Sequence, residues 1–265
     1  MNWLGNIGRK STGWLFFSAD LFGLLNLTFR EMRHVLNPSR RRIFWFLFKR
    51  QLYNSGLKAT YINTVVAIML AWLVMSKAYL MLSEGAGAVQ YYAQFFIIVV
   101  IREIGPIVSG VILIARSANA ITAEIGHLKL NNEFDVLSSM RISPVFIFLV
   151  PVFLSFPLSL LLMFFYFNIV CISFSYLFIS GLYGLDINFA DFIREIVMGI
   201  SSNEIVISIA KACLGGGLIG LISIQFGIKV GDKFTDISRA ISNSISTQFL
   251  VFISFNVALS ILAYR

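Results

Sequence analysis

The chain has 265 residues, of which 58% are hydrophobic and only 13% charged, and its mean hydropathy is +0.83. Soluble domains are nearer half apolar and a quarter charged, so this composition excludes an ordinary soluble protein. The net charge of +8 could suggest nucleic-acid binding, but the basic residues flank apolar segments. That placement is typical of the cytoplasmic side of a membrane protein, where cations meet anionic headgroups, and we expect no nucleic-acid partner.

Five segments are apolar enough and long enough to cross a bilayer as helices, which takes about 20 residues. They run approximately over 60–82, 91–118, 145–180, 204–228 and 244–264. We therefore predict an all-α polytopic membrane protein with two parts. Residues 1–58 form an amphipathic N-terminal region on the cytoplasmic leaflet, and residues 59–265 form a five-span domain.

The N-terminal region combines basic and aromatic side chains. Ten of the 21 lysines and arginines precede the first predicted span, namely Arg9, Lys10, Arg30, Arg33, Arg40, Arg41, Arg42, Lys49, Arg50 and Lys58. Residues 14–29 are short for a span and carry Asp20 near their middle, which favours a helix lying in the interface over one that crosses it. Residues 40–53 place aromatic side chains between basic clusters, a mixture suited to the headgroup boundary. We interpret 1–58 as an interfacial elbow.

The connections between spans indicate the topology. The short connection 83–90 carries only Glu84 as a charged residue and is predicted to face outward, whereas the polar segment 119–144 is predicted to face the cytoplasm. Apolar and polar residues alternate in 119–144, so a short amphipathic helix between the second and third spans is plausible. An ordinary connecting loop is the alternative.

Residues 144–185 contain no charged side chain, and a straight helix of that length would measure roughly 60 Å, twice the ~30 Å hydrocarbon core. Two spans here would place the acidic segment 186–203 in the cytoplasm and move the basic segment 229–243 outside. That arrangement contradicts the tendency of basic loops to stay inside. We therefore predict one long span, kinked or bent at Pro151 or Pro157, and a C-terminus outside the cytoplasm.

The second predicted span is interrupted by residues that are costly in hydrocarbon. Arg102 and Glu103 are adjacent, and Gly105 and Pro106 follow within a turn. The Gly-Pro pair bends or interrupts a helix, which a membrane tolerates only where protein or a wet cavity satisfies the freed backbone groups. Adjacent helical residues point about 100° apart, so Arg102 and Glu103 are not expected to face one surface.

A charge at bilayer depth costs about 2.5 kcal/mol or more, so such groups usually face a partner or a cavity. Lys211 is the other charge well inside a span and the natural partner for Glu103. One interpretation is a structural ion pair between helices. We favour the other, in which Arg102, Glu103, Gly105, Pro106 and Lys211 line or gate a polar path.

The cysteines and the glycine-rich run indicate helix packing and no binding site. Cys171 and Cys213 both fall within apolar spans and are expected to pack as small hydrophobic residues, with no metal site. The run GGGLIG at 215–220 matches a dinucleotide fingerprint only by accident, since it lies inside a span. Its Gly216 and Gly220 form a Gly-x-x-x-Gly pair, which predicts close helix packing. No Gly-x-x-x-x-Gly-Lys phosphate loop occurs in the sequence, so ATP is not bound by that means.

The run IREIGPIVSGVILIARSANAITAEIG, followed by HLKLNNEFDVLSSMRISPVFIFLVP, resembles the MlaE (YrbE) family of ABC permeases. Members show a Leu-Arg-Glu-Leu-Gly-Pro start, a central Thr-Ala-Glu-Ile-Gly run and a continuation that ends in proline. The similarity extends upstream to RQLYNSG at 50–56 and downstream to ISRAIS at 237–242. The sequence departs from the family at Ser117, at Asn132-Glu133, at Ser143 and at Asn243.

The resemblance implies a homodimeric permease that moves phospholipid between the inner and outer membranes of a diderm bacterium, through a lipid cavity at the dimer interface. It implies that a separate cytoplasmic ATPase dimer binds ATP, so this chain itself would hold no cofactor. An MCE-domain protein would sit on the periplasmic side, and a STAS-domain protein is a further possible partner. The chain would be a multi-pass inner-membrane protein with a cytoplasmic N-terminus and a periplasmic C-terminus.

The resemblance also assigns residues by position. The segment after the second span is similar to the family's coupling helix, which docks on the ATPase. The positions this implies for docking are Ala123, Glu124, Ile125, Gly126, Lys129, Asp135 and Leu137. Arg102, Glu103 and Lys211 fall at family positions for charged groups near the lipid cavity.

On this reading the chain makes and breaks no bond and is not an enzyme. One alternative is an ion-coupled secondary carrier in which Glu103 and Lys211 relay a proton. Another is a membrane anchor for a cytoplasmic enzyme, without transport. Co-purification of an ATPase would separate the permease from both.

Overall fold

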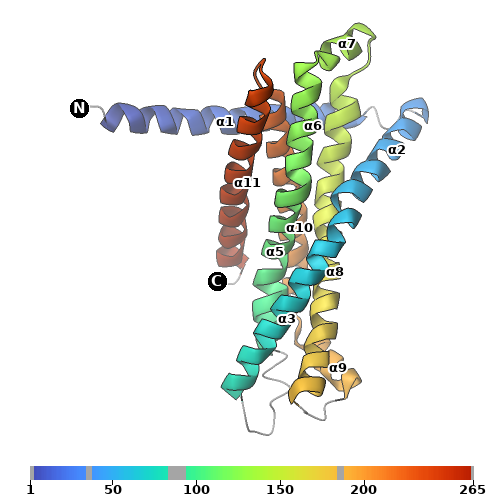
Figure 1. Ribbon diagram of the computed structural model, residues 1–265, viewed down its shortest axis with the longest axis vertical. Helices are drawn as coiled ribbons and strands as arrows, with labels where there is room; N and C mark the ends of the chain where they lie inside the picture. The colour runs from blue at the N-terminus through green and yellow to red at the C-terminus, as the bar shows by residue number, and fades with distance from the viewer. Residues whose placement is uncertain (1–2, 34–37, 83–93, 184–187, 264–265) are drawn as a thin grey trace. The chain divides into compact units, whose positions relative to one another are not determined.

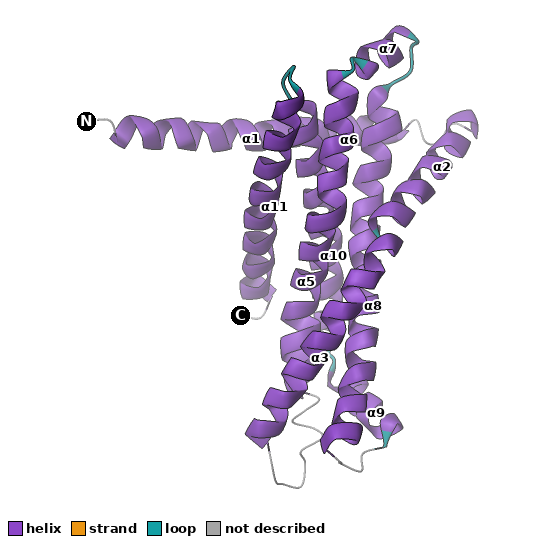
Figure 2. Ribbon diagram, in the orientation of Figure 1, coloured by secondary structure: helices purple, strands orange, loops and turns teal. Residues whose placement is uncertain are grey.

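The computed structural model describes residues 3–33, 38–82, 94–183 and 188–263 (Figure 1). Within these ranges every regular element is a helix (Figure 2), which confirms the all-α prediction. The α-helices are α1 (Trp3–Met32), α2 (Pro38–Ser55), α3 (Thr60–Leu82), α5 (Gly105–Leu113), α6 (Asn119–Leu130), α7 (Glu133–Ser139), α8 (Val150–Tyr183), α9 (Phe189–Gly199), α10 (Ser202–Ile228) and α11 (Phe234–Ala263). A 3-10 turn, η2 (Leu57–Ala59), and three π-helical segments, η3 (Ile97–Ile104), η4 (Ile114–Ala118) and η5 (Val145–Leu149), complete the chain order.

Five helical stretches in the described part of the chain are long and apolar enough to cross a membrane, as predicted. They cover Arg40–Lys77, Gln94–Leu130, Val145–Gly181, Ser202–Ile228 and Phe234–Ala263. The first predicted span, 60–82, coincides with α3, but the helix reaches back through η2 into α2. The predicted connection 83–90 lies outside the described residues.

The helix of the second predicted span does not end at residue 118 but continues through α6 to Leu130, so 119–144 begins as a helix and not as an ordinary connecting loop. Some polar side chains of α6 are exposed, such as Glu124 and Lys129, whereas others are accommodated inside the helix packing. Thr122, for example, is fully buried and its Oγ1 lies 3.2 Å from the carbonyl oxygen of Ser223 on α10 and 3.2 Å from Ser244 Oγ on α11. Such hydrogen bonds between helices let a polar residue stay in an apolar span.

Within the charge-free stretch, Val145–Gly181 is a single helical stretch long and apolar enough to cross a membrane, as predicted, rather than two. The π-helical segment η5 leads directly into α8, and Pro157 lies inside α8 without ending it. α9 follows and begins with Asn188, whose side-chain oxygen accepts a hydrogen bond from the backbone N–H of Ala190 at 3.2 Å. Asparagine is among the residues that best stabilise a helix start in this way.

The chain packs as two compact units, each assembled from three separate segments. One comprises Met1–Gln51, Ala118–Ser155 and Gly217–Gln248. The other comprises Leu52–Ser117, Phe156–Gly216 and Phe249–Arg265. The core of the second unit joins α3, η3, α8 and α9 through fully buried aromatic residues that include Phe96, Phe167 and Phe192.

In the first unit, α1 is a 30-residue helix that is not among the five candidate spans. Its contacts with the unit are specific. The carboxylate of Asp20 forms an ion pair with Lys229, the side-chain amide of Gln225 donates to the carbonyl of Phe17 at 3.2 Å, and Phe29 packs edge-on against Phe153. These contacts fix α1 against α10 and α8. Its placement in the membrane interface, like the elbow boundary at residue 58, stays a prediction.

Close helix packing at Gly216 is present in the second unit, as the Gly-x-x-x-Gly pair predicts. A Cβ atom built on Gly216 would lie 2.7 Å from the carbonyl oxygen of Phe156 and 2.8 Å from Cα of Pro157. Because both neighbours are backbone atoms of α8, no side-chain rotation could relieve that contact. Gly216 is therefore required for α10 to approach α8.

Candidate functional site: a charged cluster inside a span

The Gly-Pro pair does not break the second span; it coincides with a change of helix type. The chain is π-helical from Ile97 to Ile104 and becomes α-helical at Gly105, with Pro106 in the first turn of α5. Proline is tolerated in a first helical turn because its missing N–H needs no partner there. A Cβ on Gly105 would lie 2.9 Å from the carbonyl oxygen of Val100 and 3.1 Å from the ring of Phe164, so glycine is required. π-helical turns are rare and frequently mark functional sites.

This π-helical segment carries Arg102 and Glu103, and the structure brings Lys211 of α10 to them. The Lys211 side chain is only 1% exposed. Its ammonium donates to Ser260 Oγ at 2.7 Å, to the carbonyl oxygen of Arg102 at 3.1 Å and to Glu103 Oε2 at 3.5 Å. Ser260 in turn donates to the same Glu103 oxygen at 2.8 Å. The ion pair between Glu103 and Lys211 expected from the sequence is therefore present, and α11 contributes a hydroxyl group to it.

Arg102 completes the cluster in a way that the sequence does not predict. Its Nε lies 3.5 Å from Glu103 Oε1, although adjacent helical residues were expected to face different surfaces. Long, flexible side chains can converge even when their Cα–Cβ bonds diverge, and both side chains here fold toward α10. The Arg102 guanidinium also lies 4.0 Å from Glu204 Oε1, in the first turn of α10.

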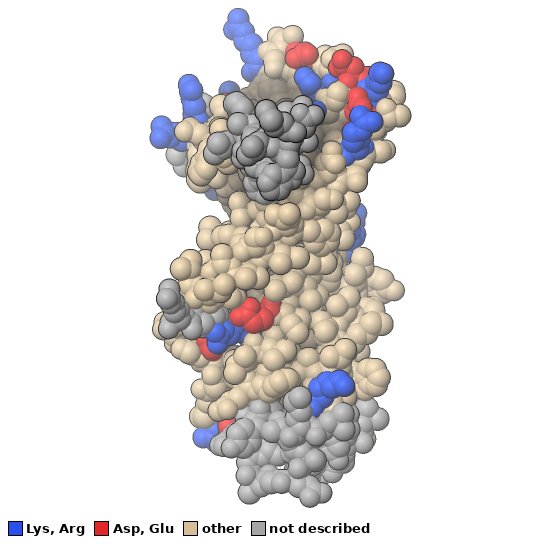
Figure 3. Space-filling view, turned by 90° about the vertical axis from the view of Figure 1, so that its left-hand side faces the viewer, with Lys and Arg blue, Asp and Glu red and all other residues tan. Residues whose placement is uncertain are grey.

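The cluster is balanced in charge, with two cations and two carboxylates drawn from η3 and α10 and a serine from α11. Arg102 is 22% exposed, Glu103 36% and Glu204 19%, while Lys211 is buried. Figure 3 shows acidic and basic side chains side by side at mid-height, with mostly uncharged residues around them. Buried charges persist in an apolar environment only when they are paired and hydrogen-bonded, and this cluster satisfies both conditions.

Arg116, the third charge of the interrupted span, has a different environment. Its guanidinium lies 3.4 Å from the carbonyl oxygen of Asn54, near the end of α2, and the neighbouring Ser117 donates to the carbonyl of Ser55 at 3.0 Å. Cations stabilise the carbonyl end of a helix. Arg116 and Ser117 therefore fasten the second π-helical segment, η4, to the end of α2.

The residues assigned to docking lie on two helices and differ in exposure. Ala123, Glu124, Ile125, Gly126 and Lys129 are on α6, and Asp135 and Leu137 are on α7. Ile125 and Gly126 are buried: a Cβ on Gly126 would lie 3.0 Å from Val230, and one on Gly227 would lie 2.7 Å from Cβ of Ile125. These two residues hold α6 against the end of α10 and the segment that follows it, so they are not available to a partner.

The exposed members of the set are Glu124, Lys129 and Asp135. Glu124 lies 3.5 Å from the guanidinium of Arg50 on α2, and the two side chains are 45% and 55% exposed. This ion pair ties α2 to α6 within the first unit. Asn132, at the turn between α6 and α7, has a left-handed backbone with φ of 56° and begins α7. Asparagine is one of the few residues that adopt this conformation readily.

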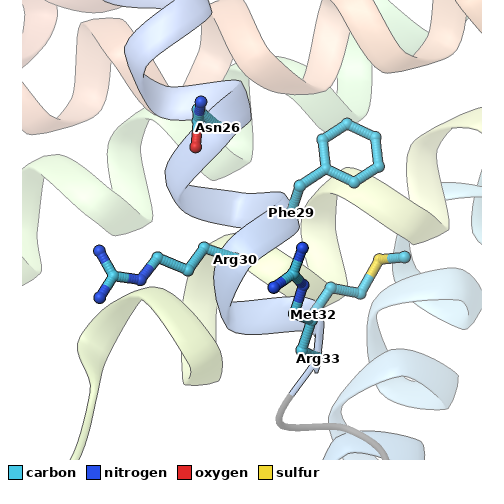
Figure 4. A pocket seen from close by; sticks show the side chains of 5 residues that line it. All are labelled: Asn26, Phe29, Arg30, Met32 and Arg33. Atoms are coloured by element: carbon cyan, nitrogen blue, oxygen red, sulfur yellow. The ribbon is translucent and has the colours of Figure 1, made fainter.

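A hollow of about 640 Å³ lies beside the last turns of α1 (Figure 4). Its lining residues are Asn26, Phe29, Arg30, Met32 and Arg33. Arg30 and Arg33 are both exposed, so this end of α1 offers two cations next to apolar side chains. Such a mixture suits the headgroup region of a membrane, where arginine stems lie on apolar surface and their charges reach water.

Comparison with known proteins gives a consistent result. A family model described as permease MlaE matches residues 48–262. A probable ABC transporter permease protein of Rickettsia typhi is 22% identical over 267 residues, which cover 99% of this chain and 98% of that protein. A second one, from Rickettsia prowazekii, is 22% identical and the alignment covers 94% and 93% of the two chains. The intermembrane phospholipid transport system permease protein MlaE of Haemophilus influenzae is 25% identical over 108 residues, 41% of each chain.

Proposed function

The chain belongs to the MlaE permease family, and from that membership we propose that it is the membrane subunit of an ABC transporter that moves phospholipids between the inner and outer membranes of a diderm bacterium. The observation that carries the proposal is the family match, which begins inside α2 and ends inside α11. It therefore includes the whole charged cluster. The Haemophilus relative is named for intermembrane phospholipid transport, and its similarity supports the choice of substrate.

In this proposal the chain supplies a path and a separate subunit supplies energy. A permease of this kind makes and breaks no bond; a cytoplasmic ATPase dimer binds and hydrolyses ATP. The sequence has no Gly-x-x-x-x-Gly-Lys phosphate loop, in keeping with that division. The exposed residues Glu124, Lys129 and Asp135 would contribute to ATPase docking.

We further propose that two copies of the chain enclose a lipid cavity, toward which Arg102 and Glu103 present their charges. An MCE-domain protein on the periplasmic side would receive or deliver the lipid, and a STAS-domain protein could bind the ATPase. Support for the polar lining comes from the partial exposure of both side chains within an apolar span. A structural ion pair alone would have no need of an exposed carboxylate.

Purification of the tagged chain from its native membrane tests the proposal. We expect an ATPase and phospholipids to co-purify, and the purified complex to hydrolyse ATP in a vanadate-sensitive manner. Mass spectrometry would identify both the subunits and the lipids. Lipid transfer that needs an ion gradient and no ATPase would favour a secondary carrier built on Glu103 and Lys211, and a complex with a cytoplasmic enzyme but without lipid would favour an anchor.

The proposed orientation has its own test. Residues 1–58, 119–144 and 229–243 should face the cytoplasm, while 83–90 and 181–203 should face the periplasm, because basic residues concentrate in the first group. Arg40, Lys233 and Asn188 are exposed. Single cysteines introduced at these positions can therefore be tested for labelling from outside intact cells. We expect a membrane-impermeant reagent to label only the cysteine at 188. Labelling at 233 would contradict the five-span topology.

A further inference from the structure

We propose that Thr122 and Gln248 are positioning residues that join α6 to α10 and α11, so that a displacement of α6 by the ATPase also displaces these two spans. This inference rests on the proposed function and adds to it the side chains through which ATP hydrolysis acts on the lipid path. Both residues are fully buried in helical stretches that are long and apolar enough to cross a membrane. A buried hydroxyl or amide group is unfavourable unless it is hydrogen-bonded, so the partners of these two side chains are informative.

The side-chain amide of Gln248 joins α11 to α10. Its Nε2 donates to Oγ of Ser223, on α10, at 2.9 Å and to Oγ of Ser244, one turn earlier on α11, at 2.7 Å. An amide nitrogen has two N–H donors, so these bonds use both of them. The two serines are also fully buried, and all three residues belong to the first unit. Gln248 therefore fixes α10 and α11 relative to each other at this point.

Thr122 brings α6 into contact with the same two serines. Its Oγ1 lies 3.2 Å from the carbonyl oxygen of Ser223 and 3.2 Å from Oγ of Ser244. The carbonyl oxygen of Ala118, one turn earlier in the chain, lies 3.1 Å away and is a third neighbour of this hydroxyl group. Thr122, Ser223, Ser244 and Gln248 thus form one buried polar network that joins three spans.

Close packing beside the polar network holds α6 directly against α10. A Cβ atom built on Gly227 would lie 2.7 Å from Cβ of Ile125 and 3.2 Å from the carbonyl oxygen of Thr122. The two helices therefore meet through backbone and Cβ atoms, with no flexible side chain between them. Interiors packed this closely transmit a displacement instead of absorbing it, and hydrogen bonds between helices add to the connection. We therefore expect α6, α10 and α11 to move together here.

The opposite side of α6 carries Glu124 and Lys129, the exposed residues of that helix proposed to dock on the ATPase. A force applied there by the ATPase reaches α10 and α11 through the buried polar network, since coupling is carried by packed side chains and hydrogen-bond networks. Both helices continue for about three turns to residues of the charged cluster, Lys211 on α10 and Ser260 on α11. The polar network thus stands between the docking helix and the proposed lipid path.

A buried polar network can also serve stability alone, so the variants must separate the two roles. Thr122→Val keeps the shape of the side chain and removes its hydroxyl group, whereas Thr122→Ser keeps the hydroxyl group. Gln248→Leu removes the amide on a different helix. Thr28→Val is the matched control: Thr28 is also fully buried in the first unit, but its Oγ1 donates to the carbonyl of Leu24, within α1, at 2.7 Å.

The measurement uses the complete transporter in vesicles of phosphatidylethanolamine and phosphatidylglycerol, and it determines phospholipid transferred and ATP hydrolysed in the same sample. We expect Thr122→Val and Gln248→Leu to hydrolyse ATP at close to the wild-type rate. The lipid transferred per ATP should fall about threefold to tenfold, the factor expected when one or two hydrogen bonds are lost. Thr122→Ser should retain most of the wild-type ratio and Thr28→Val all of it. The combined variant should lose little more than either single one, because both act through one network.

An unchanged amount of lipid per ATP in Thr122→Val and Gln248→Leu would overturn the inference, and so would an equal fall in Thr28→Val. Hydrolysis and transfer that decline in proportion, or failure of both variants to fold, would assign the polar network to stability alone. If only one variant fails to fold, the other decides. ATP-driven transfer by the wild type with an unchanged ratio in the variants would leave the proposed function standing, whereas a wild type without ATP-driven transfer would remove both.

Discussion

Glu103→Ala is expected to destabilise the protein by about 3 kcal/mol or more, because it leaves the buried ammonium of Lys211 without its carboxylate. Lys211 is 1% exposed, and its other acceptors include Ser260 and the carbonyl of Arg102, neither of which carries a charge. The expected loss lies at the lower end of the range for breaking a buried ion pair, since the Glu103 side chain is 36% exposed and partly screened by solvent. Thermal unfolding in detergent measures the loss.

The double variant Glu103→Ala with Lys211→Ala removes both charges, and its stability should return close to that of the wild type. Replacing both members of a buried pair is often nearly neutral, whereas breaking one side is costly. If Glu103 lines a lipid path, the double variant will fold but still transfer phospholipid poorly in proteoliposomes. Full recovery of transfer together with stability would show that the pair serves helix packing alone.

The ion pair between Glu103 and Lys211 could be predicted from the sequence. Charges inside an apolar span must find partners, and Lys211 was the other cation at comparable depth, so the interaction followed from the cost of burying it alone. The contributions of Ser260 and Glu204 could not be predicted in the same way. A serine in a membrane helix is common, and Glu204 falls at the edge of its span, where a charge needs no explanation.

The sequence predicted a short helix within 119–144 but not the extent of the helical structure there. The pattern of 119–144 leaves open a short amphipathic helix or a connecting loop, whereas α6 continues the helix of the second span to Leu130 and buries Thr122 through hydrogen bonds to α10 and α11. A hydropathy scale treats a polar side chain as exposed. Only tertiary contacts show which polar side chains form hydrogen bonds in the interior. The resemblance assigns Ile125 and Gly126 to docking by position alone, which carries no information on burial, and both are buried against the end of α10 and the segment after it.

Glu124→Lys is expected to abolish recovery of the ATPase when the tagged chain is purified, while leaving membrane insertion intact. Glu124 is exposed on α6, and reversal of its charge would place a cation where, in the proposed docking, the ATPase would meet a carboxylate. Like charges juxtaposed at an interface can cost several kcal/mol. Immunodetection of the ATPase in the purified complex measures docking, and membrane fractionation measures insertion.

The ion pair with Arg50 offers a second explanation for such a loss, and a charge exchange can separate the two. Glu124→Lys places its cation next to Arg50, so the variant could fail only because α2 and α6 no longer hold together. Arg50→Glu combined with Glu124→Lys restores an attractive pair across the same 3.5 Å contact with the charges reversed. If Glu124 contacts the ATPase directly, the exchanged variant will insert normally and still fail to bind it. Recovery of the ATPase by the exchanged variant would instead assign Glu124 to holding α2 against α6, and docking would then depend on the other exposed residues, Lys129 and Asp135.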